Sequence, residues 1–70
     1  MNAELLLAKI REEGISMGRF LQSIHMSSST WNKKIGGIYE FDRDEMQRII
    51  MRLKLKEIDV TVIFFGRNVS

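Results

Sequence analysis

Apolar residues recur along the chain at spacings of three and four, the spacing that places side chains on one face of an α-helix. In the first such segment Leu6 and Ile10 lie four apart, Asn2 can cap the helix start, and Gly14 suits a left-handed stop. The pattern therefore predicts a first helix over residues 3–13.

Three further helix starts share one pattern, in which an apolar residue precedes a capping residue and a second apolar residue follows four positions after the cap. This is the hydrophobic staple, which fixes how the chain enters a helix. The copies are Ile15-Ser16 with Phe20, Met26-Ser27 with Trp31, and Phe41-Asp42 with Met46. In the third copy Glu45 also occupies the capping-box position. The pattern predicts three short helices with defined starts.

These helices are expected over 17–24, 28–35 and 43–53, with Gly36-Gly37 ending the middle one. Their apolar stripes predict the core. The predicted core residues are Phe20, Leu21 and Ile24 in the first of these helices, Trp31 and Ile35 in the second, and Met46, Ile49, Ile50 and Leu53 in the third.

The segment 56–65 has two interpretations. As a helix it would align Ile58, Val62 and Phe65, whereas the β-branched and aromatic residues of 60–65 could equally form a strand. We favour the helix, which makes the fold all-α with five helices. Residues 66–70 are expected to fray.

Composition limits what this fold can do. The chain has 70 residues, one His and no Cys, so it lacks the ligands for a zinc cluster. We expect one domain over 1–65, with no metal and no cofactor. Helix capping explains the serines near His25, and so small a helical domain offers little pocket, so we expect no enzymatic activity.

No segment resembles a membrane span or a secretory signal. The apolar run at 60–65 is too short to cross a bilayer, and Glu4 interrupts the apolar start of the chain. We therefore expect a cytoplasmic protein without membrane contact.

The net charge of +2 conceals an uneven distribution. Residues 14–39 contain no acidic residue, whereas Arg19, Lys33 and Lys34 lie among them. The sequence therefore predicts a locally positive face that could meet phosphate.

The helix predicted at 28–35 combines an inward Trp with a polar outer face. If Trp31 and Ile35 face inward, the side chains turned outward are Ser28, Ser29, Asn32 and Lys33. Ser and Asn can donate to and accept from base edges, and Lys can donate to guanine. These residues are the candidate base contacts in a DNA major groove.

Neighbouring residues are candidate contacts to the DNA backbone. Ser27 and Thr30 lie beside the exposed amides of the helix start, where phosphate binds readily. Lys34, Arg19 and Tyr39 would flank the groove. The alternatives are helix capping for the serines and a solvated face for the lysines.

With these residues in place, the stretch 16–37 resembles the Xre/Cro/C1-type helix-turn-helix regulators of bacteria and phages. The resemblance lies in Ser27-x-Ser29-Thr30, the basic pair, the following Ile and Gly37. The segments Tyr-Glu-Phe at 39–41 and Ile-Phe-Phe at 63–65 are similar to short phage- and mobile-element-encoded members. The resemblance implies a compact lambda-repressor-like domain with the third helix as reader, and it places the four candidate residues at base-contacting positions.

Three positions depart from the family pattern. Met17 stands where the family often has a phosphate-binding Gln, so the resemblance places Met17 among the backbone contacts. Leu21 replaces the common Ala where the two helices cross. His25 replaces the usual turn Gly, which predicts an unfavourable backbone angle or a changed turn there.

The expected function is sequence-specific binding of double-stranded DNA by a transcriptional regulator, a Cro- or C1-type repressor. One reader helix contacts only a few base pairs, so we expect a homodimer on two half-sites. The alternative is a protein-interaction module, such as an antirepressor, that binds a repressor or polymerase. The low net charge, Met17 and the bulky residues 62–65 favour this alternative.

Overall fold

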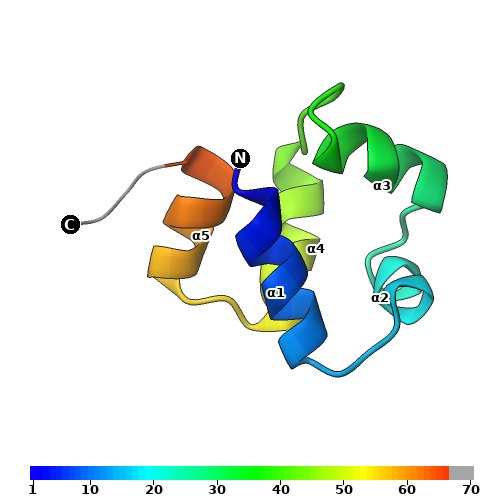
Figure 1. Ribbon diagram of the computed structural model, residues 1–70, viewed down its shortest axis with the longest axis horizontal. Coiled ribbons are helices and arrows are strands. Elements are labelled where there is room, and N and C mark those ends of the chain that lie inside the picture. The colour runs from blue at the N-terminus through cyan, green and yellow to red at the C-terminus, as the bar shows by residue number, and fades with distance from the viewer. Residues whose placement is uncertain (67–70) are drawn as a thin grey trace.

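The computed structural model describes residues 1–66, and these form five α-helices and no strand (Figure 1). The helices are α1 (Ala3–Glu12), α2 (Met17–Ser23), α3 (Ser28–Ile35), α4 (Arg43–Leu53) and α5 (Glu57–Phe65). The prediction of an all-α fold with five helices is confirmed, and the strand considered at 60–65 does not form. The tail expected to fray lies, apart from Gly66, outside the described residues.

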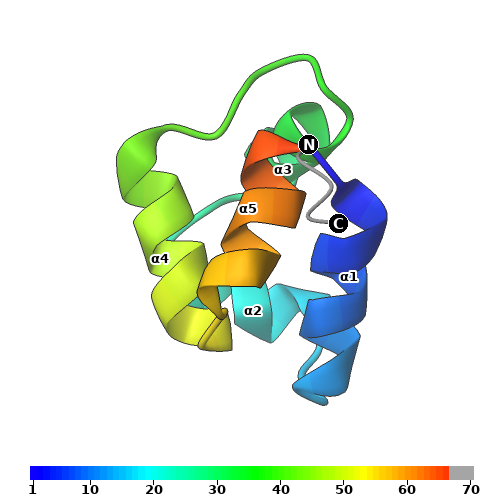
Figure 2. The same ribbon diagram turned by 90° about the vertical axis from the view of Figure 1, so that its left-hand side faces the viewer.

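The helices form two groups. Helices α1 and α5 lie side by side with α4 next to them, and α2 and α3 form the opposite end of the molecule (Figures 1 and 2). The backbone N–H of Asn2 donates to the carbonyl of Ile63 at 2.8 Å, and Lys9 Nζ lies 3.5 Å from Asp59 Oδ2. These two contacts join α1 to α5 and leave α2 and α3 protruding.

Ten buried apolar side chains form the core, and every helix contributes to it. They are Leu6, Ile10, Phe20, Leu21, Ile24, Trp31, Phe41, Ile49, Leu53 and Ile63. Four aromatic rings run through this core as neighbours. The centroid distances are 5.5 Å from Phe20 to Trp31, 5.6 Å from Trp31 to Phe41 and 6.1 Å from Phe41 to Phe64. This aromatic series connects α2 and α3 to α5.

The predicted caps are confirmed. Asn2 Oδ1 accepts from the Leu5 N–H at 3.0 Å, and Ser16 Oγ accepts from the Arg19 N–H at 3.2 Å. At α4, Asp42 and Glu45 exchange side chain–backbone hydrogen bonds at 2.8 and 2.9 Å, which completes the capping box. The three staple residues, Ile15, Met26 and Phe41, pack in or against the core, as the staple pattern requires.

Most of the residues predicted for the core in α2, α3 and α4 are buried, and three are half-buried. Ile35, Met46 and Ile50 are half-buried rather than buried, and Ile35 and Met46 pack against the core from its edge. Trp31, Ile49 and Leu53 are buried as expected.

The stripe of Ile58, Val62 and Phe65, which the helical interpretation aligns, is not the buried face of α5. Ile63 is the fully buried residue, whereas Ile58 is 54% exposed and Phe65 is 62% exposed. Apolar residues occupy most positions between 58 and 65, so the periodicity does not identify one face. The rotation of the helix is fixed instead by its contacts with α1, at Asp59 and at the Ile63 carbonyl.

Two substitutions in α4 test this division between core and surface. Ile49→Ala should lower the free energy of unfolding by about 2–5 kcal/mol, because it empties a fully buried site. Met51→Ala, two residues away and exposed, should change it by less than about 0.5 kcal/mol. Urea unfolding followed by circular dichroism measures both, and equal losses would contradict the described packing.

Candidate nucleic-acid interface

A four-residue link, residues 24–27, turns the chain sharply between α2 and α3. In Figure 1 α2 is seen nearly end-on, while α3 runs across the view. The Met26 N–H donates to the Leu21 carbonyl at 3.0 Å and the His25 N–H to the Gln22 carbonyl at 3.2 Å. This pair of bonds is the Schellman motif, which ends a helix with one left-handed residue.

The left-handed residue is His25, whose φ is +58°. This angle confirms the unfavourable backbone angle that the sequence predicted there. A non-glycine residue in this conformation costs about 1–2 kcal/mol, because its Cβ crowds the following carbonyl. The surrounding contacts of the link must offset this cost.

The outer face of α3 carries the predicted base-contacting residues. Ser28, Ser29, Asn32 and Lys33 are all exposed, and Trp31 is buried beneath them. The structure therefore brings these four residues together on one surface of a two-turn helix. Within residues 1–66, Lys33 has no carboxylate within ion-pair distance.

The side chains of Ser27 and Thr30 at the start of α3 take part in capping hydrogen bonds. Ser27 Oγ accepts from the Thr30 N–H at 3.2 Å, and the Ser27 hydroxyl donates to Thr30 Oγ1 at 3.0 Å. Capping therefore explains Ser27, as the alternative interpretation had it. The Thr30 hydroxyl keeps its own proton as a donor, although its residue is half-buried.

Lys34 lies differently from the other candidates. Its ammonium is paired with Glu45 of α4, and the side chains of the two residues are only 13% and 11% exposed. The Lys34 Nζ also lies 6.0 Å from the centre of the Phe41 ring. Lys34 is therefore directed toward the body of the protein and is poorly placed to reach a phosphate.

The remaining flanking candidates divide into two kinds. Arg19 and Tyr39 are exposed, and Arg19 has no ion-pair partner among the described residues. Met17 is half-buried and packs against the core. A thioether carries no N–H or O–H donor, so the Met17 side chain offers a phosphate oxygen no hydrogen bond.

One polar residue that contacts the link was not identified from the sequence. Arg48 of α4 donates from Nη1 to the carbonyl oxygen of Ile24 at 2.7 Å and pairs with Asp44 at 2.9 Å. The helical spacing of Asp44 and Arg48 indicates their ion pair. No local pattern indicates a contact between residues 24 positions apart.

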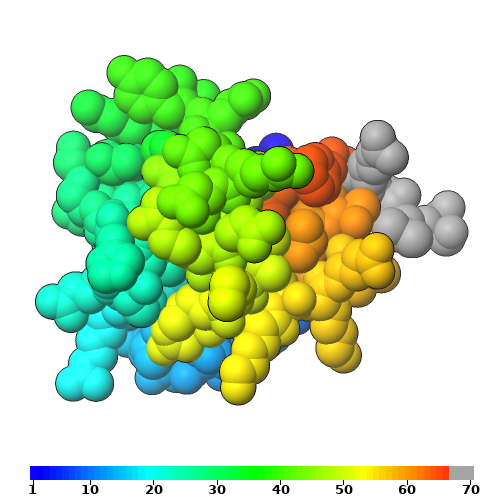
Figure 3. All heavy atoms as spheres, turned by 180° about the vertical axis from the view of Figure 1, so that it is seen from behind, coloured from blue at the N-terminus to red at the C-terminus, as the bar shows by residue number. Residues whose placement is uncertain are grey.

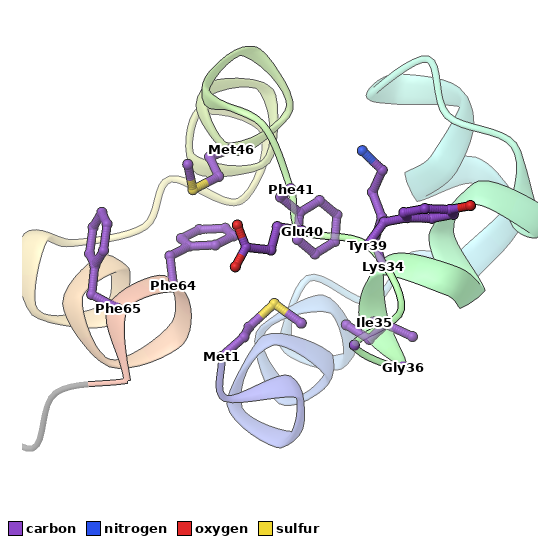
Figure 4. Close-up of a pocket in the computed structure, with 11 residues that line it drawn as sticks. Met1, Lys34, Ile35, Gly36, Tyr39, Glu40, Phe41, Met46, Phe64 and Phe65 are labelled. Carbon is purple, nitrogen blue, oxygen red and sulfur yellow. The ribbon is translucent and has the colours of Figure 1, made fainter.

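A second surface feature lies beside α3. A cleft of about 620 Å³ opens between the end of α3, the segment 39–41 and the end of α5. Figure 4 shows Phe41, Phe64, Met46 and Glu40 among the residues around it. Polar and apolar groups line it in about equal measure, and Lys34 and Glu40 are its charged side chains.

Neither a metal-binding cluster nor a membrane-spanning helix is found among the described residues. No cluster of three or more His, Cys, Asp or Glu that could hold a metal ion is found within 1–66. In the same residues, every helix is too short or too polar to traverse a bilayer.

The strain at His25 gives a testable prediction. His25→Gly should leave the free energy of unfolding unchanged or raise it by up to about 1 kcal/mol, because Gly tolerates positive φ. His25→Val should lower it by about 1–2 kcal/mol, because a β-branched residue tolerates this region least. Chemical denaturation compares the two variants with the wild type, and a Val variant as stable as the Gly variant would contradict the assigned backbone angle.

Comparison with known proteins gives no family or function for the chain. The chain matches no protein-family model, no curated protein and no solved structure. A function must therefore be inferred from the arrangement of α2 and α3 and from the side chains that they expose.

Proposed function

We propose that the protein is a sequence-specific double-stranded DNA-binding transcriptional regulator, with α3 reading the major groove. The observation that carries this proposal is the outer face of α3. Ser28, Ser29, Asn32 and Lys33 are exposed there on a helix held from below by the buried Trp31. These side chains supply donors and acceptors for base edges.

The arrangement of α2 and α3 suits a helix-turn-helix. In that motif the second helix enters the major groove and the first crosses the backbone, joined by a short turn. Here the link is four residues long, and α2 carries the exposed Arg19 near its start. We therefore also propose a helix-turn-helix identity of the lambda-repressor-like kind, with Arg19 as a backbone contact and Tyr39 as a further candidate.

The charge distribution supports DNA as the partner. Residues 14–39 contain no carboxylate side chain, and the carboxylate that contacts them, Glu45, is neutralised by Lys34. Arg19 and Lys33 remain exposed. Because the free cations are few, we expect a modest dependence of affinity on salt. In this role the protein needs no catalytic group, metal or cofactor, and it would act as a repressor in the cytoplasm of a bacterial cell.

A second copy of the chain would complete the DNA site. One reader helix contacts too few base pairs for useful specificity, and a symmetric dimer doubles the number. The exposed residues Ile58 and Phe65 lie seven apart on α5, with Val62 between them on the same face. We propose this apolar stripe as the dimer contact.

A second candidate function is favoured by the cleft beside α3. A cleft with the apolar side chains of Phe41, Phe64 and Met46 beside charged ones could receive an amphipathic segment of a protein partner. A repressor or polymerase bound there would make the protein an antirepressor or a related interaction module. Selection of bound sequences from a random pool of DNA decides between the two functions. A DNA-binding regulator enriches one sequence, whereas an interaction module enriches none.

The DNA proposal makes a prediction for Asn32 and Arg19. On the site enriched by selection, Asn32→Ala should relax the preference at one base pair by about 1–3 kcal/mol, because it removes a base contact. Arg19→Ala should weaken binding to all sequences alike and reduce the salt slope by about 1, because it removes a phosphate contact. Fluorescence anisotropy at several salt concentrations measures both effects.

Lys56→Ala is the charge-matched control for these variants. Lys56 is exposed just before α5, and α5 lies at the opposite end of the molecule from α2 and α3 (Figure 1). The Lys56→Ala variant should leave the base preference of the protein unchanged. Wild-type base preference in Asn32→Ala would show that the reading face is misassigned.

The dimer proposal makes a separate prediction. Phe65→Glu or Ile58→Glu should convert a dimer to a monomer without unfolding it, because both side chains are exposed in the single chain. Met51→Glu, on the exposed face of α4, is the control. Light scattering after size exclusion gives the masses, and a wild-type protein that is monomeric at high concentration would refute the α5 contact.

A further inference from the structure

We infer that Arg48 of α4 is a positioning residue that sets the angle at which α3 is presented to DNA. The inference rests on the proposed function. Arg48 Nη1 donates to the Ile24 carbonyl at 2.7 Å, and Nη2 lies 2.9 Å from Asp44 Oδ2. Ile24 is buried, and this hydrogen bond connects α4 to the main chain of the α2–α3 link.

The Ile24 carbonyl that accepts from Arg48 lies at the C-terminal end of α2, where carbonyls have no intrahelical hydrogen-bond partner. The Schellman bonds of the link use the carbonyls of Leu21 and Gln22 and leave that of Ile24 without a backbone partner. The end of a helix favours a cation, yet α2 carries no basic residue in its last turn. Arg48 supplies that cation from another helix.

The same contact fixes the peptide plane at the left-handed residue. The Ile24 carbonyl and the His25 N–H belong to one peptide group, and the φ of +58° at His25 starts from that plane. Only Met26 and Ser27 separate His25 from the first residue of α3. A rotation of this plane would therefore redirect the whole of α3.

Helix α4 also holds the other end of α3. Glu45 pairs with Lys34, and its carboxylate accepts from the Asp42 N–H at 2.9 Å. Glu45 and Arg48 lie three apart, so they share one side of α4. In Figure 3 α4 lies between the end formed by α2 and α3 and helix α5. Thus α4 holds α3 near its start through Arg48 and near its end through Glu45.

The effect of Arg48 on the position of α3 can be measured separately from its effect on the stability of the protein. Its Nε–H is buried without a hydrogen-bond partner among the described residues. Arg48→Met removes the contact to Ile24, but it also removes this unpaired polar group while keeping an apolar stem of similar length. The Ile24 carbonyl loses its partner, which lowers stability, while removal of the unpaired Nε–H raises it. We therefore expect these opposing effects to leave the melting temperature little changed, with a clear change at the link.

Amide hydrogen exchange and DNA discrimination together test the inference. In the free protein, Arg48→Met should speed exchange of the His25 and Met26 amides about tenfold, with the amides of Leu6 and Ile49 unchanged. On the selected DNA, its preference over single-base variants should fall about fivefold or more at several positions, with the salt slope unchanged. Arg48→Lys, which can still donate to the carbonyl, should recover part of both effects.

Arg52→Met is the matched control. Arg52 lies one turn further along α4, its side chain is 33% exposed like that of Arg48, and it pairs with Glu13 at 3.2 Å rather than with the link. Wild-type exchange at His25 and Met26 in Arg48→Met, or an equal effect of Arg52→Met, would overturn the inference. If the wild type prefers no DNA sequence, the proposed function fails, and the exchange data still decide whether Arg48 fixes the link.

Discussion

The structure depends on the burial of Trp31. Its ring packs edge to face against Phe20 of α2 and at a tilt against Phe41, which in turn contacts Phe64 of α5. A chain of 70 residues without Cys has few other means of holding a two-turn helix against its body. Aromatic pairs of this geometry add to the free energy gained by burial alone. Because Trp31 faces inward, Ser28, Ser29, Asn32 and Lys33 face outward.

The local features of the fold could be predicted from the sequence, because their causes are local. A cap and its amide lie three residues apart, so Ser16, Ser27 and Asp42 mark their helices in the sequence alone. The rotation of α5 could not be predicted, because its apolar residues cover most of its circumference and contacts with α1 decide which of them is buried. The outer face of α3 was predictable because one buried Trp fixes the phase of a short helix.

The charges were harder to assign than the fold. Arg19, Lys33 and Lys34 look alike in the sequence, yet Lys34 is paired with a carboxylate that lies 11 residues further on. Arg48 looks like an ordinary surface arginine with an acidic neighbour, yet it reaches a backbone carbonyl 24 residues away. The role of a long basic side chain depends on what the fold brings within its reach, and periodicity does not contain that information.

The single Trp of the chain has a practical consequence. Trp31 is almost fully buried, directly beneath the face of α3 proposed to meet DNA. Its emission reports on α3 alone, without a chemical label. Exposure of the ring to water on unfolding shifts its spectrum, whereas a ligand on the opposite face of the helix leaves the ring in its aromatic surroundings. The protein therefore carries an optical probe that distinguishes loss of the fold from occupation of the helix that the fold presents.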